Sequence, residues 1–217
     1  MLHIITPLYL IEYLEKVYFS INADSDITWH ISKTKKLELP DFSFLKTDKR
    51  IKIYEIDCDE SETYKKRNTI LENIKDGYFC FLDDDTTFHE NMYVKYRQSQ
   101  EQNLVGMLIG NQLFPDGKVR LLASKPQHMK IDTGNVLCHH SALSEVRWPS
   151  SHEDKVNNKD FIFWNNVYNF FGEKCYLTND PISNYNKLSG KLSYYYTPTF
   201  VLDRNGRPIK VMSQSKI

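Results

Sequence analysis

The sequence lacks the features that would place the protein in a membrane, outside the cell or on nucleic acid. No run of about eighteen consecutive apolar residues is present, so no segment is predicted to span a membrane. The beginning, MLHIITPLYL, has neither the basic start nor the small-residue cleavage site of a signal peptide. The 28 Lys and Arg residues balance the 28 Asp and Glu residues, so no overall field attracts a polyanion. We therefore expect a cytoplasmic protein with no membrane span and no nucleic-acid partner.

Cysteine is scarce and scattered. Cys58, Cys80, Cys138 and Cys175 form no CxxC pair, which argues against a zinc site. A disulfide framework is unexpected in a chain of 217 residues. We expect free thiols, mostly buried.

The length suits one core rather than two independent domains, so residues 1–217 are treated as a single domain. In the first half, apolar runs alternate with segments of helical spacing. This alternation predicts an α/β fold with a mostly parallel central sheet flanked by helices. The predicted strands are 2–6, 27–31, 51–56 and 78–82, and the predicted helices are 10–21 and 62–75.

The second half is less regular. Strands are predicted at 105–109 and 135–139, with a hairpin turn at 115–117 and an aromatic-faced helix at 160–171. From residue 179 the chain is rich in Asn, Ser, Tyr and Lys. We expect this last segment to wrap over the sheet or to form a mobile cover.

Three adjacent carboxylates, Asp83, Asp84 and Asp85, directly follow the apolar run 78–82. In a mostly parallel sheet, ligands bind at the carboxyl ends of the strands, where these residues would lie. Adjacent carboxylates repel one another, and a divalent cation such as Mg²⁺ or Mn²⁺ would compensate the repulsion. The alternative is a helix N-terminus, where aspartates cap free amides. The triplet alone leaves both interpretations open.

A combination of short motifs favours the metal interpretation. The segment 5–9 (ITPLY), Trp29, the pair Arg67-Asn68 and the run 78–88 (YFCFLDDDTTF) occur in this order. The combination resembles the nucleotide-sugar half of glycosyltransferases with the GT-A fold and a DxD motif. The nearest patterns are those of the inverting glucuronyltransferase family and the family-2 enzymes. The match covers about residues 1–110, which we expect to form the nucleotide-binding half, with 111–217 as the acceptor-side half.

The resemblance implies a role for each matched residue. Asp85, with Asp83, would bind Mn²⁺ or Mg²⁺, and the metal would stabilise the departing nucleoside diphosphate. Asp83 and Asp84 would contact the ribose or metal-bound water, and Arg67 the base or the diphosphate. The residues expected to hold the base are Thr6, Pro7 and Tyr9. One departure weakens the uridine assignment: the second strand ends in 30–33 (HISK), where the families place an acidic residue.

The acceptor side supplies a candidate general base. Inverting transfer needs a carboxylate to take the acceptor hydroxyl proton, and Asp160 resembles the acidic residue that precedes an aromatic helix in family 2. A simple helix N-cap is the alternative, with Glu153 and Asp154 in reserve. The segment 132–135 (DTGN) resembles the loop of the donor-sugar pocket, where Gly134 permits close approach. It could equally be a turn before a strand.

The predicted function is metal-dependent, inverting transfer of a hexosyl-type sugar, from a UDP-sugar donor to a hydroxyl of a glycan or glycoprotein. A nucleotidyltransferase would need a glycine-rich loop after the first strand, and residues 6–10 (TPLYL) contain no glycine. A non-catalytic carbohydrate-binding or scaffold protein with a structural calcium site is the remaining alternative. By general appearance, the chain also resembles small glycosyltransferase domains of large algal DNA viruses, which glycosylate capsid proteins.

Overall fold

A computed structural model describes residues 1–21, 23–59, 62–128, 130–150 and 159–189, and the backbone of two further strands, β10 (Pro198–Leu202) and β11 (Pro208–Met212). β10 and β11 pair antiparallel with each other in a separate two-stranded sheet. Within the described parts of the chain, no helix is both long and apolar enough to cross a bilayer.

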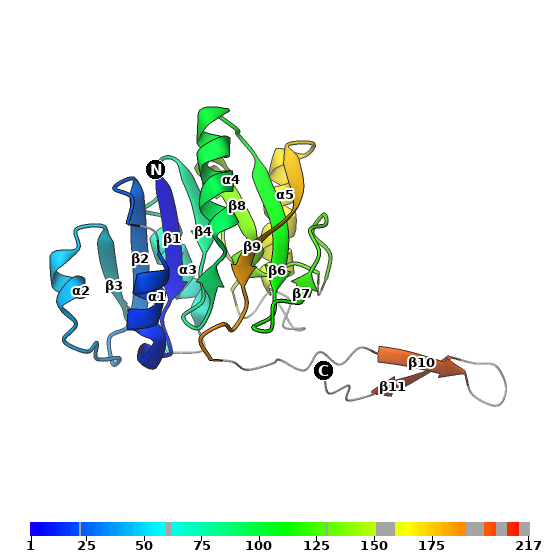
Figure 1. Ribbon diagram of the computed structural model, residues 1–217, viewed down its shortest axis with the longest axis horizontal. Coiled ribbons are helices and arrows are strands. Elements are labelled where there is room, and N and C mark those ends of the chain that lie inside the picture. Colours follow the sequence, from blue (N-terminus) through cyan, green and yellow to red (C-terminus); the bar gives the residue numbers. More distant parts are fainter. Residues whose placement is uncertain are drawn as a thin grey trace.

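A nine-stranded sheet runs through the molecule in the order β3-β2-β1-β4-β8-β6-β9-β5, with β7 paired to β6 (Figure 1). The first four strands in this order are parallel, β8 is antiparallel to its neighbours, and β6 and β9 are again parallel. The strands are β1 (Leu2–Pro7), β2 (Ile27–Thr34), β3 (Ile51–Ile56), β4 (Tyr78–Phe81), β5 (Thr87–Phe88), β6 (Met107–Leu113), β7 (Val119–Leu121), β8 (Val136–His139) and β9 (Cys175–Asn184).

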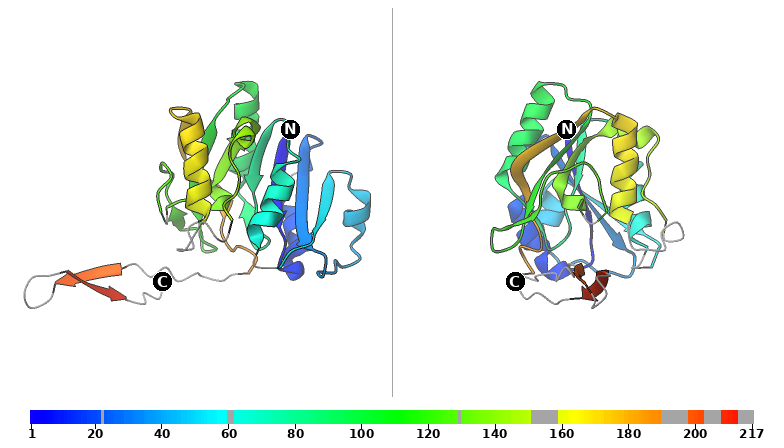
Figure 2. Two further views of the ribbon diagram at one scale, coloured as in Figure 1. Left: turned by 180° about the vertical axis from the view of Figure 1, so that it is seen from behind. Right: turned by 90° about the vertical axis from the view of Figure 1, so that its right-hand side faces the viewer.

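Helices cover both faces of the sheet (Figure 2). One face packs against α3 (Thr63–Leu71) and α5 (Lys159–Phe171), and the other against α1 (Leu14–Ser20), α2 (Ser43–Thr47) and α4 (Glu90–Glu101). Three 3₁₀ turns complete the described elements: η1 (Ile11–Tyr13), η2 (Thr133–Asn135) and η3 (His140–Ser144).

β4 shows why a continuous apolar run belongs at the centre. Phe79 and Phe81 face the α3 and α5 side, whereas Tyr78, Cys80 and Leu82 face the α1 and α4 side. Successive side chains of a strand point to opposite faces, so a strand covered on both faces is apolar throughout. The predicted α/β fold with a mostly parallel sheet is confirmed.

Gly77 explains the sharp entry into β4. Its φ angle is +67°, and a Cβ at this position would lie 2.1 Å from the backbone oxygen of Met1. Any other residue would suffer both backbone strain and a clash, so the glycine permits the chain to turn into β4.

The expectation for the end of the chain was wrong over residues 179–184. These residues belong to β9, which lies inside the sheet between β6 and β5. The segment has a mixed burial pattern and contains Pro181, and its pairing with β6 is irregular after Ile109. The bulge accommodates the proline, which cannot donate to the ladder.

The predicted boundary between two halves falls inside β6, so the halves share one sheet. The predicted hairpin turn at 115–117 is confirmed: Phe114 N–H donates to Lys118 O at 2.7 Å, and β7 pairs with β6. All four cysteines are free thiols, and Cys80 and Cys138 are buried.

Candidate active site

Several polar groups meet at one edge of the sheet. β1 and β4 are parallel, so their carboxyl ends lie together, and residues 83–85 follow β4 there. β8 is antiparallel to β4, so the residues just before β8, which form η2, lie at the same edge. Thr133 of η2 confirms the proximity, because its hydroxyl donates to Asp83 Oδ2 at 3.2 Å.

The three consecutive aspartates have three separate partners. Asp84 Oδ2 accepts the backbone N–H groups of Tyr9 at 2.5 Å and of Leu10 at 2.7 Å. Asp85 Oδ2 accepts the hydroxyl of Ser189 at 2.7 Å. Asp83 faces η2 and helix α3 instead. Each carboxylate therefore has its own donors, and the repulsion inferred from the sequence is offset without requiring a cation at all three.

Asp84 supports the loop after β1. The residue is only 6% exposed, and both of its amide partners lie in the β1–η1 connection. We therefore assign Asp84 to the support of this loop rather than to contact with a ligand.

Asp83 is the aspartate with the most perturbed ionisation. Burial raises the pKa of Asp83 to about 7, and the nearby carboxylates of Asp132, Asp160 and Asp84 act in the same direction. The guanidinium of Arg67 opposes them, with Nη2 3.5 Å from Asp83 Oδ1. A carboxylate held in this way readily accepts a cation or a hydrogen-bond donor.

Arg67 and Asn68 anchor the segment that leads toward α5. The guanidinium of Arg67 stacks on the ring of Trp148 at 4.1 Å. Asn68 Nδ2 donates to Trp148 O at 3.0 Å, and Trp148 N–H donates to Asn68 Oδ1 at 2.8 Å. Arg67 is only 8% exposed, so it reaches a ligand chiefly through Asp83.

The three residues of β1 and the following loop that were predicted to hold the base have different surroundings. Thr6 is fully buried, and its hydroxyl accepts Trp29 Nε1–H at 2.9 Å, so it positions Trp29 rather than facing a ligand. Pro7 is buried at the end of β1. Tyr9 is partly exposed, its hydroxyl donates to Thr63 Oγ1 at 2.8 Å, and Lys66 Nζ lies 3.6 Å from the centre of its ring. One face of the Tyr9 ring is thus covered by an ammonium group.

The end of β2 also differs from an acidic base-reading site. Lys33 is 5% exposed, and its ammonium pairs with Glu55 Oε1 at 2.7 Å across β2 and β3. The Lys33 ammonium group is therefore already paired within the sheet.

Asp132 opens η2 and forms the most buried ion pair of the site. Its Oδ2 lies 2.9 Å from Nη1 of Arg120, whose side chain is 3% exposed. Oδ1 accepts Gly134 N–H at 3.1 Å and lies 3.2 Å from the Thr133 hydroxyl. Burial alone would raise the pKa of Asp132, but Arg120 and these donors hold it below its ordinary value.

Gly134 packs tightly beneath this loop. A Cβ there would lie 3.1 Å from Gln112 Nε2 and 3.4 Å from Ser183 Oγ. The glycine lets η2 lie close against β6 and β9. The loop is therefore more than a plain turn before β8, because it carries Asp132 and Thr133 to Asp83.

Asp160 lies in the first turn of α5, within electrostatic range of the same group. Burial raises the pKa of Asp160 to about 6, and the charges of Arg67, Asp132 and Arg120 all act on it. A carboxylate with a pKa nearer neutrality is better suited to take a proton than an ordinary one. The structure therefore brings together Asp83, Asp132 and Asp160, which are far apart in the sequence.

The carboxylates at this edge of the sheet are oxygen ligands of the kind that Mg²⁺ and Mn²⁺ bind. Within the described ranges, no three His, Cys, Asp or Glu side chains converge as a metal site. Magnesium, however, usually takes only one or two protein carboxylates and completes its shell with phosphate and water. Asp85 is partly exposed, and its Oδ1 accepts the Thr86 hydroxyl at 3.4 Å. A partly exposed carboxylate of this kind fits a cation brought in with a diphosphate.

Two tryptophans and a lysine outside the group have partners of their own. Trp148 and Trp164 are at most 2% exposed and pack in the hydrophobic core. Lys187 Nζ donates to Pro115 O at 3.0 Å. The reserve bases Glu153 and Asp154 lie outside the described residues.

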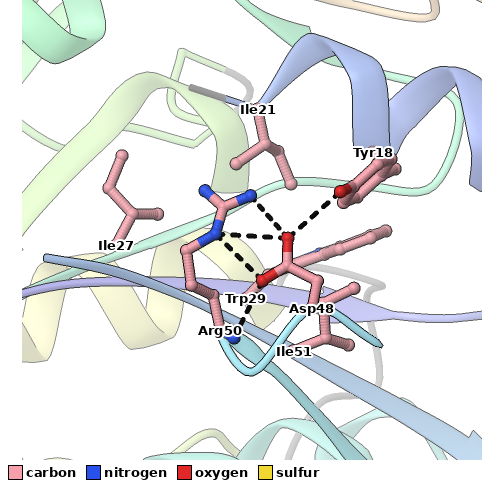
Figure 3. A pocket seen from close by; sticks show the side chains of 7 residues that line it. All are labelled: Tyr18, Ile21, Ile27, Trp29, Asp48, Arg50 and Ile51. Atoms are coloured by element: carbon pink, nitrogen blue, oxygen red, sulfur yellow. Dashed lines mark hydrogen bonds and ion pairs between the residues drawn. The ribbon is translucent and has the colours of Figure 1, made fainter. Parts of the chain in front are cut away.

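A separate cavity under α1 is too small for a substrate. It is lined in part by Tyr18, Trp29, Asp48 and Arg50, where Asp48 accepts hydrogen bonds from Arg50 and Tyr18 (Figure 3). Its volume is about 10 Å³, room for about one water molecule. It is a packing defect beside a structural ion pair.

Sequence reasoning missed Arg120 and Ser189. Arg120 is a lone basic residue in a hairpin, and Ser189 lies in a polar segment, so neither belongs to a recognisable pattern. The charge of Asp132 was the available signal, because a buried carboxylate needs a cationic partner.

The arrangement of the sheet and its helices identifies a class of fold. A mostly parallel, curled mixed sheet flanked by helices is the fold of GT-A-type glycosyltransferase domains. Solved structures of S. aureus TarS are among those that share it. TarS 1–349 in complex with UDP-GlcNAc gives a TM-score of 0.66 at 10% identity, over 84% of this chain and 57% of that one.

Two further TarS structures agree. The complex of TarS 1–349 with UDP gives a TM-score of 0.65 at 13% identity, over 84% of this chain and 59% of that one. A longer TarS structure gives 0.63 at 12% identity, with 84% and 36% covered. This chain thus spans less than 60% of the TarS chains it resembles. At such identities the likeness shows the fold alone, and neither a family model nor a curated protein matches the sequence.

Proposed function

We propose that the protein transfers a sugar from a UDP-sugar to a hydroxyl of a glycan or glycoprotein, with inversion and with Mn²⁺ or Mg²⁺. The observation that carries the proposal is the grouping of Asp83, Asp132 and Asp160 at the carboxyl edge of the sheet, beside Arg67. The fold adds support, because TarS shares it and has been solved with UDP-GlcNAc and with UDP.

Each group has a proposed task. Asp85 and Asp83 hold the cation, which when bound supplies Lewis acidity to the departing diphosphate. Tyr9 offers its ring to the base from a loop that Asp84 holds in place. Arg67 orients Asp83 through their ion pair and opposes the burial that raises the pKa of this carboxyl.

Asp160 is the proposed general base. It takes the proton of the acceptor hydroxyl as the acceptor oxygen bonds to the anomeric carbon, and the bond from that carbon to the diphosphate oxygen breaks. Its raised pKa supports this role. Attack by the acceptor on the side opposite the leaving group inverts the anomeric centre.

The hexosyl nature of the donor, a capsid glycoprotein as acceptor and a cytoplasmic setting in a bacterium or virus-infected host belong to the same proposal. They rest on the resemblance and on the sequence expectation.

The test is release of UDP from UDP-sugars with Mn²⁺, measured for the wild type and for Asp85→Ala. We expect metal-dependent release that the variant loses. Absence of both UDP binding and UDP release, with metal present and the protein folded, would refute the proposal and favour the scaffold alternative.

A further inference from the structure

Lys66 is a lysine that the fold buries completely. It lies in α3, and its relative exposure is 0%. Burying an ammonium group is costly unless polar partners compensate the loss of water, so the position of this lysine needs an explanation. Its contacts point to the loop after β1.

Two contacts place the ammonium group behind Tyr9. Lys66 Nζ lies 3.6 Å from the centre of the Tyr9 ring and donates to Leu8 O at 3.3 Å. The first distance is within the range of a cation–π interaction, which is stronger when the cation is removed from water. Because Lys66 is fully enclosed, it supports Tyr9 and does not itself contact a ligand.

The same face of α3 holds the hydroxyl of the tyrosine. Thr63 precedes Lys66 by three residues, so the two side chains share one face of the helix. Thr63 Oγ1 accepts the Tyr9 hydroxyl at 2.8 Å. Asp84 Oδ2 accepts the Tyr9 backbone N–H at 2.5 Å. Tyr9 is therefore fixed at its backbone, at one face of its ring and at its hydroxyl.

Tyr9 nevertheless remains partly exposed at the carboxyl edge of the sheet, in the loop that follows β1. With a cation covering one face of the ring, the opposite face is the one left for an aromatic ligand. Nucleobases stack on such rings whatever their hydrogen-bonding edge. Fixing the ring before the ligand arrives removes part of the entropic cost of binding.

From these contacts, and resting on the proposed function, we infer that Lys66 is a positioning residue for the nucleotide. Its ammonium group holds the Tyr9 ring from behind, so that the nucleobase of the donor stacks on the other face. The charge of Lys66 thus contributes to nucleotide affinity through Tyr9 without touching the nucleotide. The alternative is that Lys66 only supports the loop through its hydrogen bond to Leu8 O, in which case its charge is not needed.

The test is isothermal titration of the whole chain with UDP and Mn²⁺, for the wild type and two variants. Lys66→Gln keeps a donor for Leu8 O but loses the cation, whereas Lys66→Met loses both. We expect both variants to bind UDP about tenfold more weakly, because each removes the charge behind the ring. Lys65→Met is the matched control, since this neighbouring lysine pairs with Glu62 at the helix surface, and it should bind UDP as the wild type does. Thermal unfolding verifies that each variant is folded.

A double-mutant cycle with Tyr9→Ala shows whether Lys66 acts through the tyrosine. Tyr9→Ala should itself weaken UDP binding roughly tenfold or more. Adding Lys66→Gln to Tyr9→Ala should then change the affinity by less than about twofold, because the ring that the lysine holds is already absent. An equal loss from Lys66→Gln in both backgrounds, or wild-type affinity of folded Lys66→Gln, would overturn the inference and leave the proposed function standing. If the wild type does not bind UDP with Mn²⁺, both are wrong.

Discussion

Asp84 and Asp85 are adjacent in sequence, yet the structure gives them different tasks that one pair of variants can separate. Asp84 is 6% exposed and accepts two backbone N–H groups, from Tyr9 and Leu10, on a single oxygen. Asp84→Ala leaves both buried donors unsatisfied. Each such group costs about 1–3 kcal/mol, so the two together should lower the unfolding free energy by roughly 2–6 kcal/mol.

Asp84→Asn sharpens the test. An amide oxygen in the same position can still accept both N–H groups, so only the charge assistance is lost, at about 1 kcal/mol. Asp85→Ala removes a partly exposed carboxylate whose two donors are hydroxyl groups, Ser189 at 2.7 Å and Thr86 at 3.4 Å, so its cost should stay below about 1 kcal/mol. For a chain of this size, each kcal/mol lowers Tm by about 2–4 °C.

The assay is thermal and urea unfolding of the three variants beside the wild type. We expect the order of stability to be wild type, Asp85→Ala, Asp84→Asn and then Asp84→Ala, with the last lower in Tm by roughly 4–24 °C. Asp85→Ala should lose Mn²⁺-dependent UDP binding at nearly full stability. A Tm for Asp84→Ala within 2 °C or so of the wild type would refute the assignment of Asp84 to loop support.

Three further variants test other contacts. Asn68→Ala removes both hydrogen bonds to the Trp148 backbone, and we expect the unfolding free energy to fall by about 1–3 kcal/mol. Turnover should also fall, about tenfold or more, because the Trp148 ring that supports Arg67 shifts. Asp160→Asn should lower kcat by about 10²–10⁴-fold while UDP binding persists, measured by UDP release and titration. His30 is buried, and burial, followed by the charge of His3, lowers its pKa to about 3. The neutral imidazole therefore contributes its full stability above about pH 6.5, and this contribution is lost as the pH falls toward about 3. The loss in unfolding free energy should reach about 4–5 kcal/mol. His30→Gln should flatten this dependence, measured as urea midpoints against pH.

Controls separate these effects from general damage. His128→Gln changes an exposed histidine and should leave the pH dependence of stability as in the wild type. If the stability of His30→Gln changes with pH as steeply as that of the wild type between pH 3 and 6.5, another titrating group causes the pH dependence. If the turnover of Asp160→Asn is within threefold of the wild type, Asp160 is a helix cap and not the general base. Wild-type stability of Asn68→Ala would show that Trp148 is held by packing alone.

β1 and β4 could be predicted because burial on both faces makes them continuously apolar, and β3 because its apolar residues alternate with polar ones. These three strands agree with prediction to within a residue, whereas the helix expected over 62–75 ends early, at Leu71. β9 was missed because Pro181 and polar residues interrupt its pattern, and its place is set by pairing with β6. α4 was missed because its sequence, ENMYVKYRQSQE, buries only a narrow stripe.

The sequence indicated candidate site residues but not the contacts between them. The motif order indicated Asp83, Arg67 and Asp160, and the fold brings them within electrostatic range of one another. The partners of Thr6 and Asp84 could not be read from the sequence, because they lie 23 and 75 residues away. A sequence motif identifies the residue types, whereas the packing of the sheet determines which of them can face a ligand.

The most direct test of the account is isothermal titration with UDP, with and without Mn²⁺, for the wild type and Asp85→Ala. The account predicts binding that requires the metal and that Asp85→Ala loses while remaining folded. Binding of neither UDP nor GDP by the folded wild type in the presence of Mn²⁺ or Mg²⁺ would contradict it, and would make the carboxylates at this edge of the sheet structural.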